Sequence, residues 1–178
     1  MKQWDAIQAL RLFDQKGRYV FIKNDLVKLF SHDAPKTFDE GLNRLVKTGV
    51  LKRVCRGVYV NEQAQCCDPY TIEHIAKTLR RNFYNYVSLE SMLSEYGLIS
   101  QIPLDRLTIM TTGRSGIYKT DYGTIEFTHT KRTLSTLLDH MQRVEGRPLR
   151  IATKEMALRD LKRVGRNLHL IQREQDDE

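Results

Sequence analysis

The chain of 178 residues has no long apolar run and only three cysteines. Its uncharged apolar stretches are far shorter than the roughly 18 residues that a membrane span needs, and residues 1–10 lack the basic-then-apolar order of a signal peptide. An odd number of cysteines, two of them adjacent at Cys66 and Cys67, makes a poor disulfide framework for a secreted protein. We therefore expect a cytoplasmic protein that does not enter a membrane.

The sequence also lacks the spacings that mark catalytic and metal sites. The cysteines form no C-x₂₋₄-C pair, the five histidines are scattered, and H-E-x-x-H and G-x-S-x-G are both absent. The phosphate-binding patterns G-x-x-x-x-G-K and G-x-G-x-x-G are absent too, so TTGRSG at 111–116 is interpreted as a loop between strands rather than an anion-binding nest. We expect no catalytic residue, no metal, no cofactor and no enzymatic activity.

What the chain does have is a positive charge concentrated in its first third. The net charge is +7, and residues 1–60 hold 12 Lys and Arg against 6 Asp and Glu, whereas the remainder holds 17 against 16. A localised basic surface attracts a polyanion, because binding releases the counterions that nucleic acid condenses. Double-stranded DNA is therefore the expected partner of the first sixty residues.

These sixty residues follow the order helix, strand, helix, turn, helix and hairpin. A short apolar run at 19–22 precedes a second helix with Asn24 as its N-cap, and Pro35 begins a third helix that continues to about Thr48. In VLKRVCRGVYV at 50–60, Arg56-Gly57 fits the tip of a β-hairpin. The first helix precedes Gly17 and is predicted from apolar residues at helical spacing, namely Trp4, Ile7, Ala9, Leu10, Leu12 and Phe13. This order predicts a winged helix-turn-helix over 1–60.

The third helix separates a buried stripe from a polar face. Its stripe comprises Phe38, Leu42, Leu45 and Val46. A solvated helix carries similar residues on its outer face, but the preceding helix and turn and the basic hairpin favour a DNA contact. Five basic residues and no acidic one lie between Arg44 and Arg56, where a wing contacts phosphates. The predicted DNA-binding residues are Lys36, Thr37, Glu40, Asn43, Arg44 and Lys47 on the helix and Lys52, Arg53 and Arg56 on the hairpin.

A second domain is expected after a polar linker at 61–68. Helical spacing predicts helices over 70–82, 88–96 and 153–164, and β-branched runs predict strands over 106–111 and 117–127. The domain at 69–170 is therefore a small α+β domain. The acidic end at 171–178 has few apolar anchors and is expected to be disordered.

Several segments in succession, covering about 50–164, resemble the AbiEi family, the antitoxin and autorepressor of type IV toxin-antitoxin and abortive-infection loci. RGVY at 56–59 resembles the family's wing strand, DPYTI at 68–72 its linking helix, and YVSLESMLSEYGLISQIP at 86–103 its "ylSleSAL..yGl..q.P" signature. TIMTTGRSGIYKTDYGTIEFTH at 108–129 resembles the strands that follow, and IATKEMALRDL at 151–161 resembles "iAtpEkALlDl", with Lys154 in place of the usual proline.

The resemblance implies an N-terminal winged helix and a C-terminal domain that counters a cognate toxin, commonly a nucleotidyltransferase. The expected function is thus that of a transcriptional autorepressor, acting at inverted repeats in its own promoter, and of a type IV antitoxin. The alternative is a stand-alone winged-helix regulator whose second domain binds a protein partner or a ligand. No heptad pattern is sustained, so we expect a monomer in solution.

Overall fold

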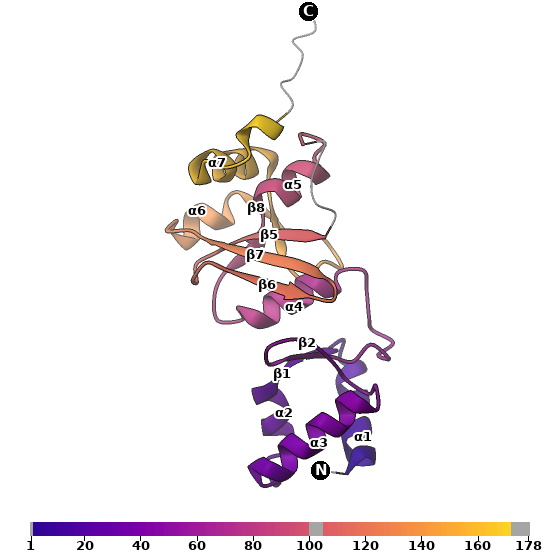
Figure 1. The fold of residues 1–178 in the computed structure, drawn as a ribbon. Helices are drawn as coiled ribbons and strands as arrows, with labels where there is room; N and C mark the ends of the chain where they lie inside the picture. Colours follow the sequence, from indigo (N-terminus) through magenta and orange to yellow (C-terminus); the bar gives the residue numbers. More distant parts are fainter. Residues whose placement is uncertain (1, 100–104, 172–178) are drawn as a thin grey trace, which may run out of the picture. The chain divides into compact units, whose positions relative to one another are not determined.

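A computed structural model describes residues 2–99 and 105–171, in which helices and two sheets form a mixed α+β protein (Figure 1). The chain divides into two compact units, Met1–Leu79 and Arg80–Glu178. None of the helices in the described residues combines the length and the apolar character needed to cross a membrane.

The first unit is built from four helices and a three-stranded sheet. In chain order its elements are α1 (Gln3–Asp14), β1 (Val20–Ile22), α2 (Lys23–Leu29), α3 (Pro35–Lys47), β2 (Lys52–Cys55), β3 (Val58–Val60) and α4 (Thr71–Leu79). The strands are antiparallel in the order β1-β3-β2, with Val20 opposite Val60 and Arg53 opposite Tyr59. The helices, the strand and the hairpin predicted for 1–60 are therefore all present.

Helices α1, α2 and α3 and the sheet share one apolar core. Its buried residues are Ala6, Leu10, Phe21, Leu26, Phe38, Leu42, Leu45, Leu51 and Tyr59. The prediction that Trp4 and Leu12 belong to the buried face of α1 is wrong, because they are 68% and 60% exposed. At about 100° per residue both lie on the side of the helix opposite Ala6 and Leu10. Asn24 is not an N-cap either: α2 begins one residue earlier, and Asp25 accepts a hydrogen bond from the Ile22 amide instead.

Residues 61–79 belong to the first unit, whereas the sequence placed a linker at 61–68 and a new domain at 69. The Asn61 amide donates to the Tyr19 carbonyl oxygen at 2.9 Å, and Ala64 is buried. Helix α4 contacts β1 and β3. The polar composition of 61–68 reflects hydrogen bonding to the first unit, so the division falls later, between Leu79 and Arg80.

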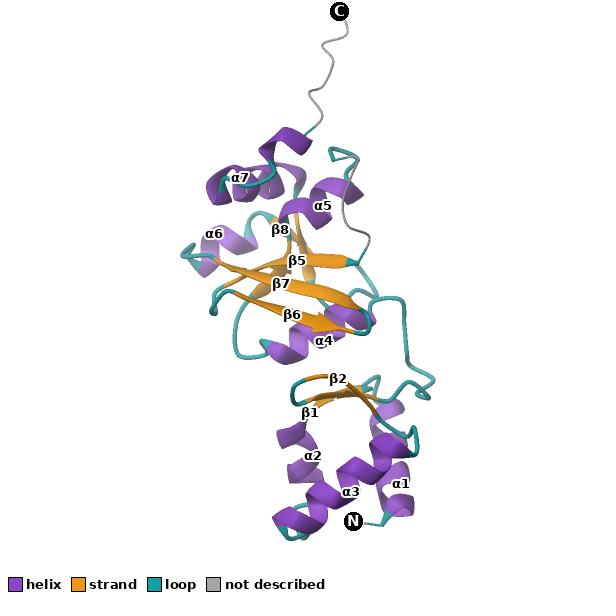
Figure 2. Cartoon of the chain, viewed as in Figure 1, coloured by secondary structure: helices purple, strands orange, loops and turns teal. Residues whose placement is uncertain are grey.

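The second unit has a six-stranded mixed sheet and three α-helices among its described residues (Figure 2). Its elements are β4 (Asn85–Val87), α5 (Leu89–Glu95), β5 (Arg106–Thr111), β6 (Gly116–Thr120), β7 (Gly123–His129), α6 (Leu134–Leu138), β8 (Met141–Gln142), β9 (Arg150–Ala152), α7 (Lys154–Val164) and the 3₁₀ turn η1 (Leu168–Leu170). The strand order is β6-β7-β5-β4-β9-β8.

The predicted strands and helices of this unit are present, with 117–127 divided into β6 and β7 by a turn before Gly123. The sequence did not reveal β4, β8, β9 or α6, each of which has five residues or fewer. Residues 172–178 of the predicted disordered tail lie outside the described residues.

Candidate nucleic-acid interface

Helix α3 presents a polar face opposite the side chains that it buries. Pro35 occupies the first turn, where its missing N–H costs nothing, and Gly49 follows the helix with φ +72°. Phe38, Leu42 and Leu45 are buried against the core of the first unit. The predicted DNA-binding residues of this helix are all exposed, namely Lys36, Thr37, Glu40, Asn43, Arg44 and Lys47.

The β2–β3 hairpin carries two exposed arginines, Arg53 and Arg56. Gly57 closes the turn with φ +76°, a conformation that glycine adopts without steric strain. Lys52 differs from the two arginines, because it is half-buried and its Nζ donates to Glu62 Oε1 at 3.1 Å. No ion pair holds Arg53 or Arg56 within the described part of the chain.

A groove of about 410 Å³ lies between α3 and the hairpin. It is lined by Asp39, Leu42 and Asn43 of α3, by Arg53, Arg56, Gly57 and Tyr59 of the hairpin region, and by Lys23 at the start of α2. The structure therefore brings three of the predicted residues, Asn43, Arg53 and Arg56, to one concave surface.

The other predicted residues of α3 are arranged around this groove in a definite order. Consecutive helical residues are separated by about 100° around the helix axis. The centre of the exposed face, next to Asn43, is therefore occupied by Lys36, Glu40 and Lys47. Thr37 and Arg44 lie roughly 100–160° around the helix axis from Asp39 and Asn43, on the flank away from the groove. Eight of the nine predicted residues thus fall into a groove group, a central group and a distant flank, and Lys52 belongs to none of the three.

Two charged groove residues, Lys23 and Asp39, were not among those predicted. Their side chains form an ion pair, with Lys23 Nζ 2.7 Å from Asp39 Oδ1. Counting the lining groups, the groove holds three cations against one carboxylate and keeps a positive charge. No sequence periodicity marks Lys23, since its place in the groove depends on the packing of α2 beside α3.

The segment after the hairpin is anchored to α1 by the Asp14 carboxylate. Asp14 Oδ2 accepts from the Gln65 amide at 3.0 Å, and Oδ1 accepts from the Cys66 amide at 2.9 Å. These backbone hydrogen bonds lower the pKa of Asp14 below its ordinary value, because they stabilise the charged form. The chain leaving β3 is thereby fixed to the helix on which the first unit begins.

A second set of contacts joins α4 to β1 through Tyr19. The Tyr19 hydroxyl lies 3.2 Å from Asp68 Oδ1 and 3.1 Å from Thr71 Oγ1, and burial raises its pKa to about 12. Asp68 Oδ2 lies 2.9 Å from His74 Nε2. Burial opposes ionisation of Asp68, but hydrogen bonds from His74 and the Tyr70 amide outweigh it and lower its pKa. These contacts keep α4 on the side of the sheet formed by β1 and β3.

The cysteines are poor nucleophiles in these surroundings. Burial raises the pKa of Cys55 and Cys67 above the ordinary thiol value and raises that of Cys66 to about 12. A thiol in this state is protonated at neutral pH. Among residues 2–99 and 105–171, no group of three His, Cys, Asp or Glu side chains is placed to hold a metal ion.

In the second unit, Asp160 of α7 is fully buried and joins α7 to β4 and to the segment before α6. Tyr86 Oη and Ser88 Oγ donate to Asp160 Oδ2 at 3.0 and 2.8 Å, and Arg132 Nη1 lies 2.9 Å from Oδ1 without good hydrogen-bond alignment. Burial raises the pKa of Asp160, against the opposing effects of Ser88, Arg132 and Tyr86. Tyr86 and Ser88 come from one segment of the family resemblance, and Asp160 comes from another.

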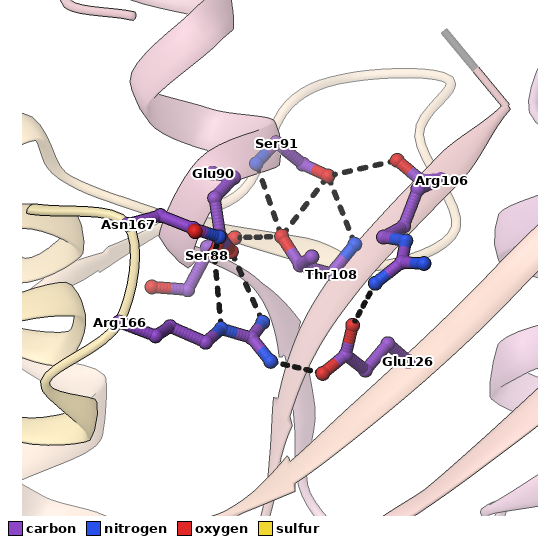
Figure 3. A network of polar contacts seen from close by, with 8 residues as sticks. All are labelled: Ser88, Glu90, Ser91, Arg106, Thr108, Glu126, Arg166 and Asn167. Atoms are coloured by element: carbon purple, nitrogen blue, oxygen red, sulfur yellow. Dashed lines mark hydrogen bonds and ion pairs between the residues drawn. The ribbon is translucent and has the colours of Figure 1, made fainter. Parts of the chain in front are cut away.

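A second polar network joins α5, β7 and the segment after α7 (Figure 3). Arg166 donates from Nε and Nη2 to the two carboxylate oxygens of Glu90 at 2.9 and 3.1 Å, and its Nη1 contacts Glu126. Glu126 also accepts from Arg106 Nη1 at 2.9 Å, while Asn167 donates to Glu90 at 2.9 Å. Both glutamates are buried, so these bonds compensate the cost of removing their charges from water.

No family model matches the chain, and none of the curated proteins searched matches it. The resemblance to the AbiEi family therefore rests on the quoted segments alone.

Proposed function

We propose that this protein is a cytoplasmic transcriptional regulator whose first unit binds double-stranded DNA as a winged helix-turn-helix. The observation that supports this most strongly is the groove that joins α3 to the hairpin, since it sets an amide and two arginines on one positive surface. A helix with an exposed polar face, such as α3, fits the major groove of B-DNA, and a hairpin beside it reaches the phosphates.

The two elements would contribute differently to binding. Asn43 has the geometry to bond adenine through two hydrogen bonds, and Glu40 can accept from cytosine N4, so α3 would read bases. Arg53 and Arg56 would bind phosphates and set the register without reading sequence. Thr37 and Arg44, on the distant flank, would meet the backbone on the other side of the groove.

For the biological role, we propose an autorepressor and type IV antitoxin, as the family resemblance implies. The protein would act as a monomer on inverted repeats of its own promoter, and its second unit would counter a toxin, commonly a nucleotidyltransferase in that family. The division into two compact units supports separate roles, because each has its own buried residues.

DNA binding is tested by selecting duplexes from a random library with the full chain and measuring the affinity for the enriched sequence. Asn43→Ala should relax the preference at one base position, whereas Arg53→Ala with Arg56→Ala should weaken binding to all sequences similarly. Arg159→Ala with Lys162→Ala removes two cations from α7 and should leave binding unchanged. If no duplex is enriched, or if this α7 variant loses as much affinity, the proposed interface is wrong.

The antitoxin role is tested by co-expression with the product of the neighbouring reading frame, which under this proposal is the toxin. The Arg53 and Arg56 double variant should derepress a promoter reporter while cells stay protected. If the variant loses protection of the cells from the toxin to the same extent as it loses repression of the reporter, at equal protein levels, the antitoxin effect is transcriptional only.

A further inference from the structure

Three loops of the second unit meet at one end of its large sheet. Asn85 at the start of β4 is opposite Thr111 at the end of β5, and Thr111 is opposite His129 at the end of β7. The segments 80–84, 112–115 and 130–133 therefore leave the sheet side by side. We call six of the exposed residues of these segments the strand-end platform: Arg81, Phe83, Tyr84, Arg114, Ser115 and Lys131.

Hydrogen bonds fix these loops to one another. The Thr112 amide donates to the Tyr84 carbonyl oxygen at 3.0 Å, and the Tyr84 amide donates to Thr112 Oγ1 at 3.1 Å. His129 Nδ1 lies 2.8 Å from the Gly113 carbonyl oxygen, and its amide donates to Ser115 Oγ at 2.9 Å. The platform is therefore held in one arrangement before any ligand arrives.

Two aromatic rings of the platform are exposed without a place in the core. Phe83 and Tyr84 are 48% and 47% exposed. The Phe83 ring packs against the backbone of Gly113 so closely that a Cβ there would lie 2.9 Å from the ring. Because residue 113 is glycine, one side of the Phe83 ring packs on its backbone, while nearly half of Phe83 remains exposed to solvent.

The segments that form the platform also carry positive charge and contribute no carboxylate. Arg81, Arg114 and Lys131 are exposed, and residues 80–89, 111–120 and 128–138 contain no Asp or Glu. The Arg80 guanidinium stacks 5.2 Å from the Tyr118 ring centroid and donates to the Arg114 carbonyl oxygen at 3.5 Å, which supports the loop. The surface therefore suits a polyanion that also offers flat apolar groups.

We propose that the strand-end platform binds single-stranded RNA. Exposed rings can stack on unpaired bases, whereas the bases of a duplex are already stacked on one another, and the cations would follow the phosphates. Ser115 Oγ already accepts from His129, so its hydroxyl hydrogen is available to a ribose 2′-hydroxyl, which DNA lacks. This ligand is separate from the duplex DNA proposed for the first unit.

The test uses the full chain and fluorescence polarisation with a labelled RNA of about 12 nucleotides, a length within the usual range of such sites. The RNA should bind more tightly than single-stranded DNA of the same sequence, and more tightly than an RNA duplex. Phe83→Ala with Tyr84→Ala should weaken RNA binding by roughly 10- to 100-fold, as expected from the loss of one or two stacked bases. Phe83→Tyr keeps a ring and should retain binding.

Two controls separate this site from the first unit and from general loss of apolar surface. Arg53→Ala with Arg56→Ala should leave RNA affinity within about twofold of the parent, and Ile117→Ala, which removes a 62% exposed apolar side chain from β6, should do the same. The proposal is overturned if single-stranded DNA or duplex RNA binds as tightly as single-stranded RNA. It is equally overturned if the double aromatic variant has the same melting temperature as the parent protein and binds RNA with the same affinity.

Discussion

Removing the two hairpin arginines should lower DNA affinity by an amount that depends strongly on salt. Arg53 and Arg56 are exposed, line the groove beside α3, and have no ion pair within the described residues, so each is available for one phosphate. Each phosphate neutralised contributes about −0.9 to the slope of log affinity against log salt concentration. Arg53→Ala with Arg56→Ala should therefore flatten that slope by about 1.8.

The slope fixes the loss of affinity at any salt concentration. Relative to about 1 M salt, two such contacts contribute roughly 1.8 log units at 0.1 M, which is about a 60-fold loss, or 2.5 kcal/mol. At about 0.2 M the same contacts contribute roughly 1.3 log units, or about 20-fold. The affinities of parent and variant should therefore converge as salt is raised.

The assay is fluorescence polarisation of the enriched duplex with the full chain over this salt range. Lys52→Ala is the informative comparison, because Lys52 is engaged by Glu62 and should change the slope less than either arginine alone. A variant pair that loses affinity equally at all salt concentrations, or that changes the preferred base, would refute phosphate binding by the hairpin.

Two further predictions concern stability. Leu93→Ala should destabilise the second unit by about 2–5 kcal/mol, because Leu93 is 0% exposed and removing its side chain leaves a cavity in the core. Urea unfolding measures the free energy of unfolding, and a change near zero would contradict the packing of Leu93. Asp14→Asn should make the first unit less stable at neutral pH. The difference in stability between parent and variant should shrink as pH falls below the ordinary carboxyl pKa of about 3.9, because a lowered folded-state pKa contributes stability only where the carboxylate is ionised. A difference that grows toward low pH would exclude the Asp14 anchor.

The sequence predicted those elements whose signals are local. Helix α3 has Pro35 in its first turn and an apolar stripe at helical spacing, and Gly57 meets the backbone demand of a hairpin turn. The exposed cations of α3 followed from that periodicity, and those of the hairpin followed from the cluster of basic residues between Arg44 and Arg56. The sequence did not predict which residues line the groove together, because the placement of Lys23 and Asp39 there depends on packing between helices.

Longer-range contacts explain the remaining differences. The polar segment 61–68 resembles a linker in composition, yet the Asp14 carboxylate accepts hydrogen bonds from its Gln65 and Cys66 amides. Strands β4 and β9 have three residues each, too few for an alternating pattern, and are defined by parallel pairing between Tyr86 and Arg150 and between Val87 and Ile151. Such pairing joins residues far apart in the chain and leaves no local signal.

The segments that carry the family resemblance have a structural role that limits what they reveal about activity. Tyr86, Ser88 and Asp160 are each 0% exposed, and their hydrogen bonds join β4 to α7. A buried cluster of this kind specifies an arrangement of elements, but it cannot touch a toxin or a nucleic acid without unfolding. Whatever the second unit binds must therefore be recognised by exposed side chains outside this buried cluster, such as Phe83 just before β4 and Arg114 between β5 and β6. Variants at those positions, rather than in the buried cluster, separate the activity of this unit from its folding.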